Sequence, residues 1–416
     1  RLSVKEALDF ADLERRIRDA AAGLGPGEVV VGNRLDDESL AERRLPTRFD
    51  LDRFLEDRPV LLYRYCGHVA VANSAALALA GVESESGILR ETDVQPVANA
   101  VGSRQRPLDP TVVRRALAGL ASLGLGKITA IVSAGDPIWC EVPNEVETLL
   151  AVAAGVPLDF EVLVIASNPA ELTAAAEGLN QGPSNVSFFG WKDFADGSLG
   201  GHTAALYEPF TDRPDTTGTL RLDYQRAVLM GRTCLDLEGT VAIHAIGDLA
   251  NDRVLDVVEE LIEAGGDHTR MRIEHASVLR PDTIVRMARL GVTASVQPSF
   301  ITSEVDWLAK RLGDRSELTY AFARLAEAGV PLVGGSDCPV ESPNPWWGIA
   351  AAAGPGGLGN EKAFGIFGQG SAVGDAANLI VVDRDPLTTP DPAGTRVLAV
   401  YRHGEQITAE SELPFV

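Results

Sequence analysis

The chain contains 416 residues, of which 45% are hydrophobic and 23% are charged. This composition is typical of a folded globular protein and excludes a mainly disordered one. The formal net charge of −22 disfavours nucleic acid and anionic membranes as partners, because the averaged field of the protein repels both.

No apolar segment approaches the length of about 18 residues that a membrane helix needs, so we expect a soluble protein. The four cysteines, Cys66, Cys140, Cys234 and Cys338, form no CxxC motif and no dense framework, which favours a reducing cytoplasm. The chain begins at Arg1 without a signal-peptide pattern, and we expect that residues preceding Arg1 are missing from the sequence.

One helix is predicted over residues 4–22, followed by a strand over residues 28–32. From Pro59 onward, short β-branched or apolar segments alternate with longer segments of helical period, which is the pattern of repeated βα units around a parallel sheet. Strands are predicted near residues 60–65, 128–134, 160–166, 186–194, 240–245, 271–275, 293–297 and 331–336. Eight strands are the number that a closed barrel uses.

Two helices in the second half have well-marked ends. The first carries an apolar stripe over residues 250–261, with Asp248 as the predicted N-cap and Gly265 as the stop. The second is predicted to begin at Pro281 and to end before Gly291.

The pattern changes after residue 350. Residues 354–374 are rich in glycine and lack a clear period, and residues 378–383 and 396–403 have the pattern of two strands. We therefore predict an α/β fold with two parts. A TIM-like (β/α)8 barrel would take residues 1–350, and a Gly-rich link with a small C-terminal β appendage would take residues 351–416.

Four of the predicted strands end at a residue that can bind a metal. Lys192 lies near the end of VSFFGWKDFAD, His244 near the end of TVAIHA and His275 near the end of MRIEHA, while Asp337 follows PLVGGS. Because the carboxyl ends of barrel strands face one common mouth, these four residues could converge on one metal centre.

Each of the four residues also has a purely structural interpretation. A single histidine at a strand end is more often a hydrogen-bonded structural residue than a ligand, and Asp337 could be a turn residue before Pro339. Lys192 is one of only five lysines and lies in an aromatic, strand-like segment. Burial of an ammonium group costs free energy unless the group is paired with an anion or takes part in chemistry. The structural alternative for Lys192 is an ion pair with Asp193 or Asp196.

Several motifs together resemble amidohydrolase family 3, and in particular its branch that contains N-substituted formamide deformylase. They are KDFADGSLGGHTAAL (192–206), HAIGD (244–248), RIEHA (272–276), QPSF (297–300), GSDCPV (335–340), CGHVAVANSAALALAG (66–81) and GILRE (87–91). The resemblance extends over most of the chain.

This resemblance implies a barrel of the metal-dependent hydrolase type, with a centre of one or two divalent metal ions, usually zinc, at the barrel mouth. Lys192 would be N-carboxylated and bridge two metals, His244 and His275 would bind the second metal, and Asp337 would bind the first and transfer protons. The implied activity is hydrolysis, by a metal-activated water, of a C–N bond other than a peptide bond in an amide, formamide, imide or cyclic amide.

The sequence departs from the family pattern at its start. The family carries a His-x-His pair at the end of the first barrel strand, whereas the first histidine of this chain is His68. We expect that the first strand and the N-terminal half of the β appendage are missing, and that a second omission lies around residues 362–375. Two other hypotheses stay open: a catalytically silent barrel that acts as a binding or assembly protein, and deaminase, lyase or isomerase chemistry at the same site.

The expected partner is a small-molecule substrate, and a homodimer is one option for the oligomeric state. Candidate substrate-binding residues are His68, His202, Gln297 and Trp346. For the two histidines the alternative is ordinary hydrogen bonding within a loop, and Trp346 could instead form an oligomer contact.

Overall fold

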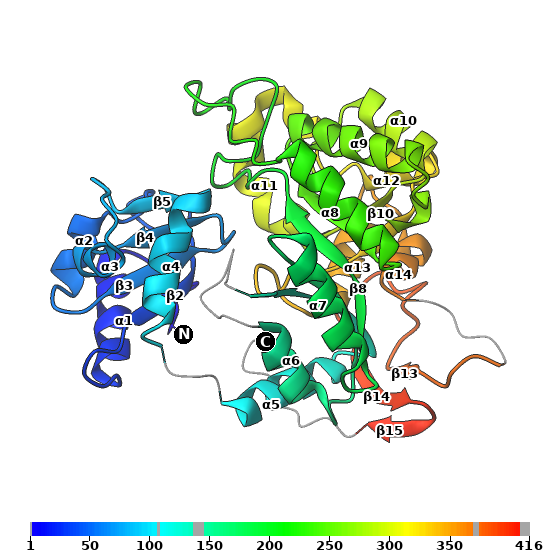
Figure 1. Ribbon diagram of the computed structural model, residues 1–416, viewed down its shortest axis with the longest axis horizontal. Helices are drawn as coiled ribbons and strands as arrows, with labels where there is room; N and C mark the ends of the chain where they lie inside the picture. Colours follow the sequence, from blue (N-terminus) through cyan, green and yellow to red (C-terminus); the bar gives the residue numbers. More distant parts are fainter. Residues whose placement is uncertain (1, 106–108, 136–144, 369–373, 408–416) are drawn as a thin grey trace. The chain divides into compact units, whose positions relative to one another are not determined.

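The computed structural model describes residues 2–105, 109–135, 145–368 and 374–407, and the chain divides into two compact units (Figure 1). The N-terminal unit comprises Arg1–Leu108 and Gly135–Asn144, and the C-terminal unit comprises Asp109–Ala134 and Glu145–Val416. This division does not coincide with the predicted parts, 1–350 and 351–416, because the first hundred residues form a sheet with two hydrophobic cores of its own.

The N-terminal unit is a five-stranded sheet with helices on both faces. Its strands, in sheet order, are β1 (Leu2–Ser3), β2 (Val30–Leu35), β3 (Val60–Arg64), β4 (Val69–Ala72) and β5 (Ile88–Arg90). The first three strands are parallel, and β4 and β5 continue the sheet antiparallel. Its helices are α1 (Phe10–Ala22), α2 (Arg48–Phe54), α3 (Ser74–Ala80), η1 (Glu91–Asp93) and α4 (Val94–Gly102).

Alternate residues of this sheet enter two separate cores, as the two-residue period of a strand dictates. Val60 and Leu62 of β3 pack with α1 and α2, whereas Leu61 between them packs with α3 and α4. The predicted helix over residues 4–22 begins later, at Phe10, because the Asp9 side chain caps it by accepting from the Asp12 backbone.

The C-terminal unit is built on seven parallel strands whose order in the sheet is their order in the chain. They are β6 (Lys127–Ser133), β7 (Asp159–Ile165), β8 (Val186–Phe194), β9 (Thr240–Ala245), β10 (Met271–His275), β11 (Thr293–Val296) and β12 (Leu332–Gly334). This curled sheet, with a helix after each strand, fits a TIM-like hydrolase fold.

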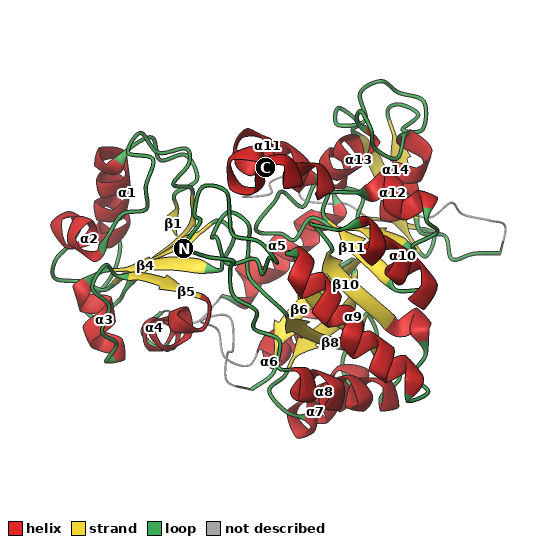
Figure 2. Cartoon of the chain, turned by 90° about the horizontal axis from the view of Figure 1, so that it is seen from above, coloured by secondary structure: helices red, strands yellow, loops and turns green. Residues whose placement is uncertain are grey.

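The helices of this unit alternate with the strands along the chain, and Figure 2 shows α8, α9 and α10 along one side of the sheet. They are α5 (Pro110–Ala121), α6 (Glu145–Ala153), α7 (Pro169–Asn180), α8 (Tyr224–Asp236), α9 (Asp248–Glu263), η2 (His268–Arg270), α10 (Pro281–Leu290), α11 (Ser299–Leu312), η3 (Gly313–Leu318) and α12 (Phe322–Glu327). The predicted ends of α10 at Pro281 and Gly291 are confirmed, whereas the N-cap of α9 is Gly247 and not Asp248.

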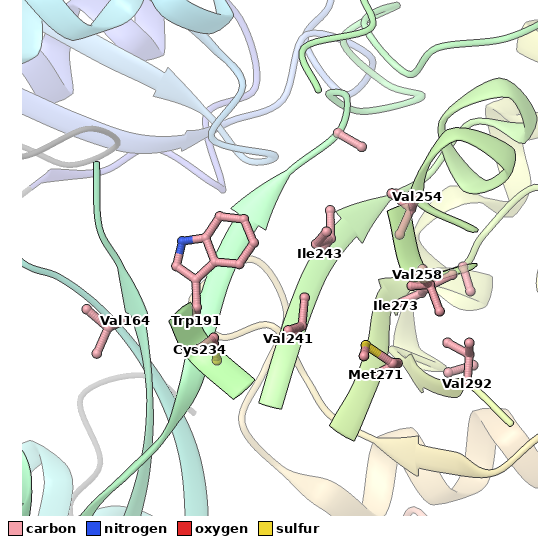
Figure 3. Packing of buried hydrophobic residues seen from close by; sticks show 14 of the residues in the cluster. Val164, Trp191, Cys234, Val241, Ile243, Val254, Val258, Met271, Ile273 and Val292 are labelled. Carbon is pink, nitrogen blue, oxygen red and sulfur yellow. The ribbon is translucent and has the colours of Figure 1, made fainter. Parts of the chain in front are cut away.

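One face of the seven-stranded sheet packs on these helices and forms the main hydrophobic core (Figure 3). Trp191, Ile243 and Ile273 from three neighbouring strands lie in this core with Val254 and Val258 of α9. Since successive side chains of a strand point to opposite faces, the residues between these apolar positions face the other side of the sheet.

The predicted C-terminal β appendage is a three-stranded antiparallel sheet of β13 (Leu379–Val382), β14 (Val397–Arg402) and β15 (Glu405–Ile407). It packs on α13 (Pro345–Ala353) and α14 (Asn360–Phe367). The helix α14 lies in the Gly-rich segment where none was expected, and residues 369–373 of the predicted second omission lie outside the described residues.

The predicted strand near residues 60–65 exists as β3, but it is wrong as a strand of the barrel sheet because it pairs with β2 and β4 of the N-terminal unit. A buried apolar segment has the same pattern in any sheet, so the sequence alone cannot assign it. Within the described ranges, none of the helices has the length and apolar character that a bilayer crossing requires.

Candidate active site

The strand register places the candidate residues in adjoining rows on one face of the sheet. Lys192 of β8 lies opposite Ala242 of β9, and two residues further on Phe194 lies opposite His244. His244 in turn lies opposite Glu274 of β10. Residues directly opposite each other in paired strands point to the same side, so Lys192, Phe194, His244 and Glu274 share the face that the helices do not cover.

Ring contacts connect the candidate residues across three strands. The Lys192 Nζ lies 3.5 Å from the centre of the Phe194 ring, and this ring lies 5.5 Å from the His244 ring. The rings of His244 and His275 are 4.5 Å apart, and the His275 ring stacks on Phe300 of α11 at 6.0 Å. The structure therefore brings Lys192, His244 and His275 together at the carboxyl ends of their strands.

The Lys192 side chain is buried, with its Nζ donating to the Asp193 carbonyl oxygen at 2.8 Å. Burial lowers the pKa of Lys192 to about 8, and the carboxylates of Glu274, Asp193 and Asp337 oppose this shift. The Asp193 carboxylate itself accepts from Arg226 of α8 at 2.7 Å. Lys192 is thus placed among several carboxylates, and Asp337 is one of them.

Asp337 follows β12 and is partly exposed, with a left-handed backbone φ of +55°. Desolvation of the carboxyl raises its pKa to about 7; Lys192 acts against this rise, and the carboxylates of Glu274 and Glu341 add to it. A left-handed conformation strains a residue other than glycine, and such residues cluster at functional sites.

The backbone of His275, the last residue of β10, is also left-handed, with φ +73°, and φ of Ala276 is +46°. In a regular strand His275 would point away from the face that carries Glu274 and His244. The positive φ ends that alternation at the position where the His275 ring meets His244.

Glu274 is a site residue that the sequence reasoning missed. It is buried, Arg272 donates to it, and Arg272 also donates to the Ser295 hydroxyl at 2.8 Å. Burial alone would raise the pKa of Glu274, but Arg272 and Lys192 hold it below its usual value. The sequence signal that could have identified Glu274 is a pair of charged residues, Arg272 and Glu274, inside the predicted strand MRIEH.

The donor types fit a divalent metal such as zinc, since two imidazoles and a carboxylate are its common protein ligands. Among the residues that the structure describes, however, no group of three or more His, Cys, Asp or Glu side chains could hold a metal ion as placed. The Nε2 of His244 lies 2.9 Å from the Gly197 carbonyl oxygen and 3.3 Å from Asp196 Oδ1. The candidate donors thus lie near one another, but within the described residues they are not arranged to bind one common metal ion.

Two of the predicted substrate-binding residues lie in the C-terminal unit near strand ends. Gln297 directly follows β11, is buried, and donates to the Ser295 carbonyl oxygen at 3.2 Å. Its Oε1 has no hydrogen-bond partner within the described part of the chain. His202, in the loop after β8, has its Nε2 3.1 Å from Asp212 and its ring against Phe210.

The other two predicted substrate-binding residues lie elsewhere. Trp346 is buried in the small core of α13, α14 and the C-terminal sheet, with its ring 6.3 Å from Phe364. His68 belongs to the N-terminal unit, where its Nδ1 lies 3.2 Å from the buried Glu91 carboxylate. The roles of both residues in substrate binding stay predictions.

Comparison with known proteins agrees with this arrangement. A model of the amidohydrolase family matches residues 1–355. The putative amidohydrolase YtcJ of Bacillus subtilis (strain 168) is 34% identical over 322 residues, which cover 74% of this chain and 60% of YtcJ, so the chain spans less than two thirds of that relative. N-substituted formamide deformylase of Arthrobacter pascens is 24% identical, over 94% of this chain and 80% of that protein.

Among solved structures, an uncharacterized metal-dependent hydrolase from Pyrococcus horikoshii OT3 matches with a TM-score of 0.63 and 30% identity. The match covers 85% of this chain and 70% of that chain. The match to the family model, the parallel sheet and the motifs at its strand ends all agree, and the resemblance predicted from the sequence is confirmed. The chain belongs to the amidohydrolase family.

Proposed function

We propose that this protein hydrolyses a C–N bond other than a peptide bond, in a small amide, formamide, imide or cyclic amide, with a divalent metal as cofactor. The observation that carries the proposal is the contact between the His244 and His275 rings at adjoining strand ends, with Lys192 beside them and Asp337 within its electrostatic reach. Titratable groups from four strands gathered at the carboxyl end of a parallel sheet are typical of a barrel active site.

In this proposal His244, His275, Asp337 and an N-carboxylated Lys192 hold one or two ions, with zinc favoured by the donor types. A cation held there would supply Lewis acidity that turns a water molecule into a nucleophile at neutral pH. Carboxylation replaces the buried ammonium of Lys192 by an anionic oxygen ligand, which removes its desolvation cost. Asp337 takes a proton from the attacking water and returns it to the leaving nitrogen.

The neighbouring polar groups orient the substrate. The Oε1 of Gln297 is a buried acceptor whose missing hydrogen bond a substrate N–H would supply. His202 is the second candidate, since Asp212 fixes its ring in the loop that follows the Lys192 strand.

An eighth strand would complete the barrel between β6 and β12, which are the two edges of the sheet. Ile131 of β6 is 42% exposed and Val333 of β12 is 38% exposed, which is unusual for apolar residues in a barrel sheet. The family pattern implies that such a strand ends in the His-x-His pair.

The proposal is tested by measuring bound metal together with turnover of a panel of N-formyl and N-acyl compounds. We expect His244→Ala and Asp337→Asn each to lower both metal content and turnover. Turnover should fall by at least about 100-fold. His268→Ala is the matched control, because the His268 side chain is 59% exposed. Unchanged metal content and turnover in both site variants would overturn the proposal.

A catalytically silent barrel that only binds its ligand is the second candidate. It is favoured by the finding that the donors within the described residues do not close around one metal. The same assay separates the two, since a silent barrel would bind panel compounds without converting any of them.

A further inference from the structure

Asp196 is a completely buried carboxylate in the loop after β8. Its Oδ2 accepts from the backbone N–H groups of Ala205 and Gly247, each at 2.8 Å, and its Oδ1 accepts from Ile246 N–H at 3.0 Å. Three backbone donors stabilise the ionised form of a carboxylate even where it is buried. One anion therefore connects the loop after β8 to the loop after β9.

The same carboxylate lies beside the His244 imidazole. The Nε2 of His244 is 3.3 Å from Asp196 Oδ1 and 2.9 Å from the Gly197 carbonyl oxygen. Both neighbours are acceptors, so this nitrogen must carry the ring proton. A neutral imidazole protonated on Nε2 has its lone pair on Nδ1, which is then the nitrogen that can bind a metal.

The surrounding backbone fixes the two acceptors that face the His244 ring. The Ala195 N–H donates to the His244 carbonyl oxygen at 2.8 Å, which fixes the end of β9 against the end of β8. A Cβ on Gly247 would lie 1.9 Å from the Ala205 carbonyl oxygen, so the two loops are in direct backbone contact. The carboxylate and the carbonyl that face Nε2 are thus held in place by packed backbone.

We propose that Asp196 is the positioning residue of His244. Its charge, 3.3 Å from Nε2, and the loop that it anchors, whose Gly197 carbonyl oxygen accepts from Nε2, together hold the ring in the Nε2–H tautomer and leave Nδ1 as the ligating nitrogen. The tautomer is a property of the chain alone, whereas the ligating role rests on the proposed function. Loss of a residue that orients a metal-ligating histidine typically changes metal affinity 10- to 100-fold.

The test is nitrogen NMR of the full chain with labelled histidine, first without metal, with the His244 signals assigned from a His244→Gln variant. We expect the wild-type His244 to carry its proton on Nε2. In Asp196→Asn, which keeps the shape but removes the charge, we expect a substantial population of the Nδ1–H form. Titration with zinc should then give a Kd about 10- to 100-fold higher than wild type.

Asp248→Asn is the matched control, because Asp248 is another buried carboxylate that accepts from two backbone N–H groups, those of Tyr207 and Leu249. This control should leave the His244 tautomer unchanged. The inference is overturned if the wild-type proton sits on Nδ1, a result that needs no variant to fold, or if Asp196→Asn keeps the wild-type tautomer. A chain that shows the Nε2–H form but binds no zinc would refute the proposed metal site and leave the role of Asp196 standing.

Discussion

His202 is an imidazole that the fold keeps neutral. Burial, with the Arg311 guanidinium nearby, lowers the pKa of His202 to about 4, although Asp212 acts in the opposite direction. Between pH 6.5 and pH 4 the unfolded chain therefore binds a proton that the folded chain does not bind, and stability falls as the pH falls through this window.

We expect His202→Gln to remove part of this pH dependence, so that its loss of stability between pH 7 and pH 4.5 is smaller than that of wild type by roughly 1–2 kcal/mol. Urea unfolding at several pH values measures the effect. His268→Gln serves as the control, since that side chain is exposed. Parallel pH profiles for wild type and His202→Gln would contradict the prediction.

When Lys192 is not carboxylated, Glu274 is the carboxylate that compensates the buried Lys192 ammonium and the largely buried Arg272 guanidinium. Arg272 donates to it, and Lys192 interacts with it electrostatically. Glu274→Gln removes this partner from one buried and one largely buried positive charge, and we expect a loss of about 3 kcal/mol in the free energy of unfolding.

The matched control for Glu274→Gln is Glu260→Gln on the surface, where the ion pair with Arg232 at 3.1 Å is largely exposed. Removal of an exposed pair should change stability by less than about 1 kcal/mol in denaturant unfolding. Equal effects of the two substitutions would show that Glu274 is not needed for charge compensation.

Single residues were predictable where the sequence marks a strand end. Lys192, His244, His275 and Asp337 could be named because each follows an apolar strand pattern, and the structure places them at strand ends. Asp196 and Glu274 could not be assigned, because their roles depend on partners that tertiary structure alone supplies, such as the Gly247 N–H and Arg272.

At the scale of elements, the loops after β8 and β9 depend on glycine for their contact. The Gly247 backbone lies so close to Ala205 that an added methyl group would overlap its carbonyl oxygen. We expect Gly247→Ala to lower the free energy of unfolding by at least about 2 kcal/mol, because either loop must shift and release a hydrogen bond to Asp196.

Gly178 of α7 provides the opposite case. A Cβ there meets no atom within 4 Å, so Gly178→Ala should stabilise the helix by about 0.5–1 kcal/mol. Thermal unfolding of the two variants beside wild type checks both signs. If Gly247→Ala were as stable as wild type, the contact between the two loops would not be essential for the fold.

The strands of the C-terminal unit were predictable because each βα repeat has a clear apolar period and ends at residues that terminate a strand or helix. The helix α10 shows this, with Pro281 in its first turn and a left-handed Gly291 after its last residue. The helix α14 was missed because the surrounding Gly-rich segment has no apolar period. Its packing against α13 depends on tertiary structure and cannot be inferred from the local sequence.

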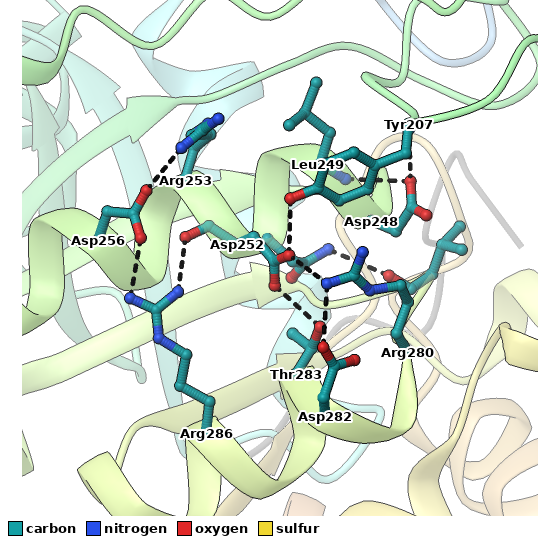
Figure 4. Close-up of polar contacts among 12 residues, drawn as sticks. Tyr207, Asp248, Leu249, Asp252, Arg253, Asp256, Arg280, Asp282, Thr283 and Arg286 are labelled. Atoms are coloured by element: carbon teal, nitrogen blue, oxygen red, sulfur yellow. Dashed lines mark hydrogen bonds and ion pairs between the residues drawn. The ribbon is translucent and has the colours of Figure 1, made fainter.

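Polar contacts between side chains of neighbouring elements also could not be predicted from the sequence. Figure 4 shows Asp252 of α9 accepting from Tyr207 of the loop after β8, from Arg280 and from Thr283 of α10. Each contact joins residues at least 28 positions apart, and only the packed structure brings them together. This network holds the loop after β8, which contains His202, against the helices α9 and α10.

At the scale of the whole molecule, the two compact units differ in what a bound metal would do to them. Lys192, His244, His275 and Asp337 all belong to the C-terminal unit. A ligand that binds only the folded state stabilises it by RT ln(1 + [L]/Kd), which is about 2.7 kcal/mol at a hundredfold excess over Kd.

We therefore expect zinc to slow hydrogen exchange most in residues 240–275, which hold β9 and β10, and a chelator to reverse the effect. Residues 60–72, which hold β3 and β4 of the N-terminal unit, should gain less protection because none of the four donors lies there. Exchange measured by mass spectrometry with and without zinc tests this, with His244→Ala as the variant that loses the response. Equal protection of both segments, or an undiminished response in His244→Ala, would place the metal somewhere other than at these strand ends.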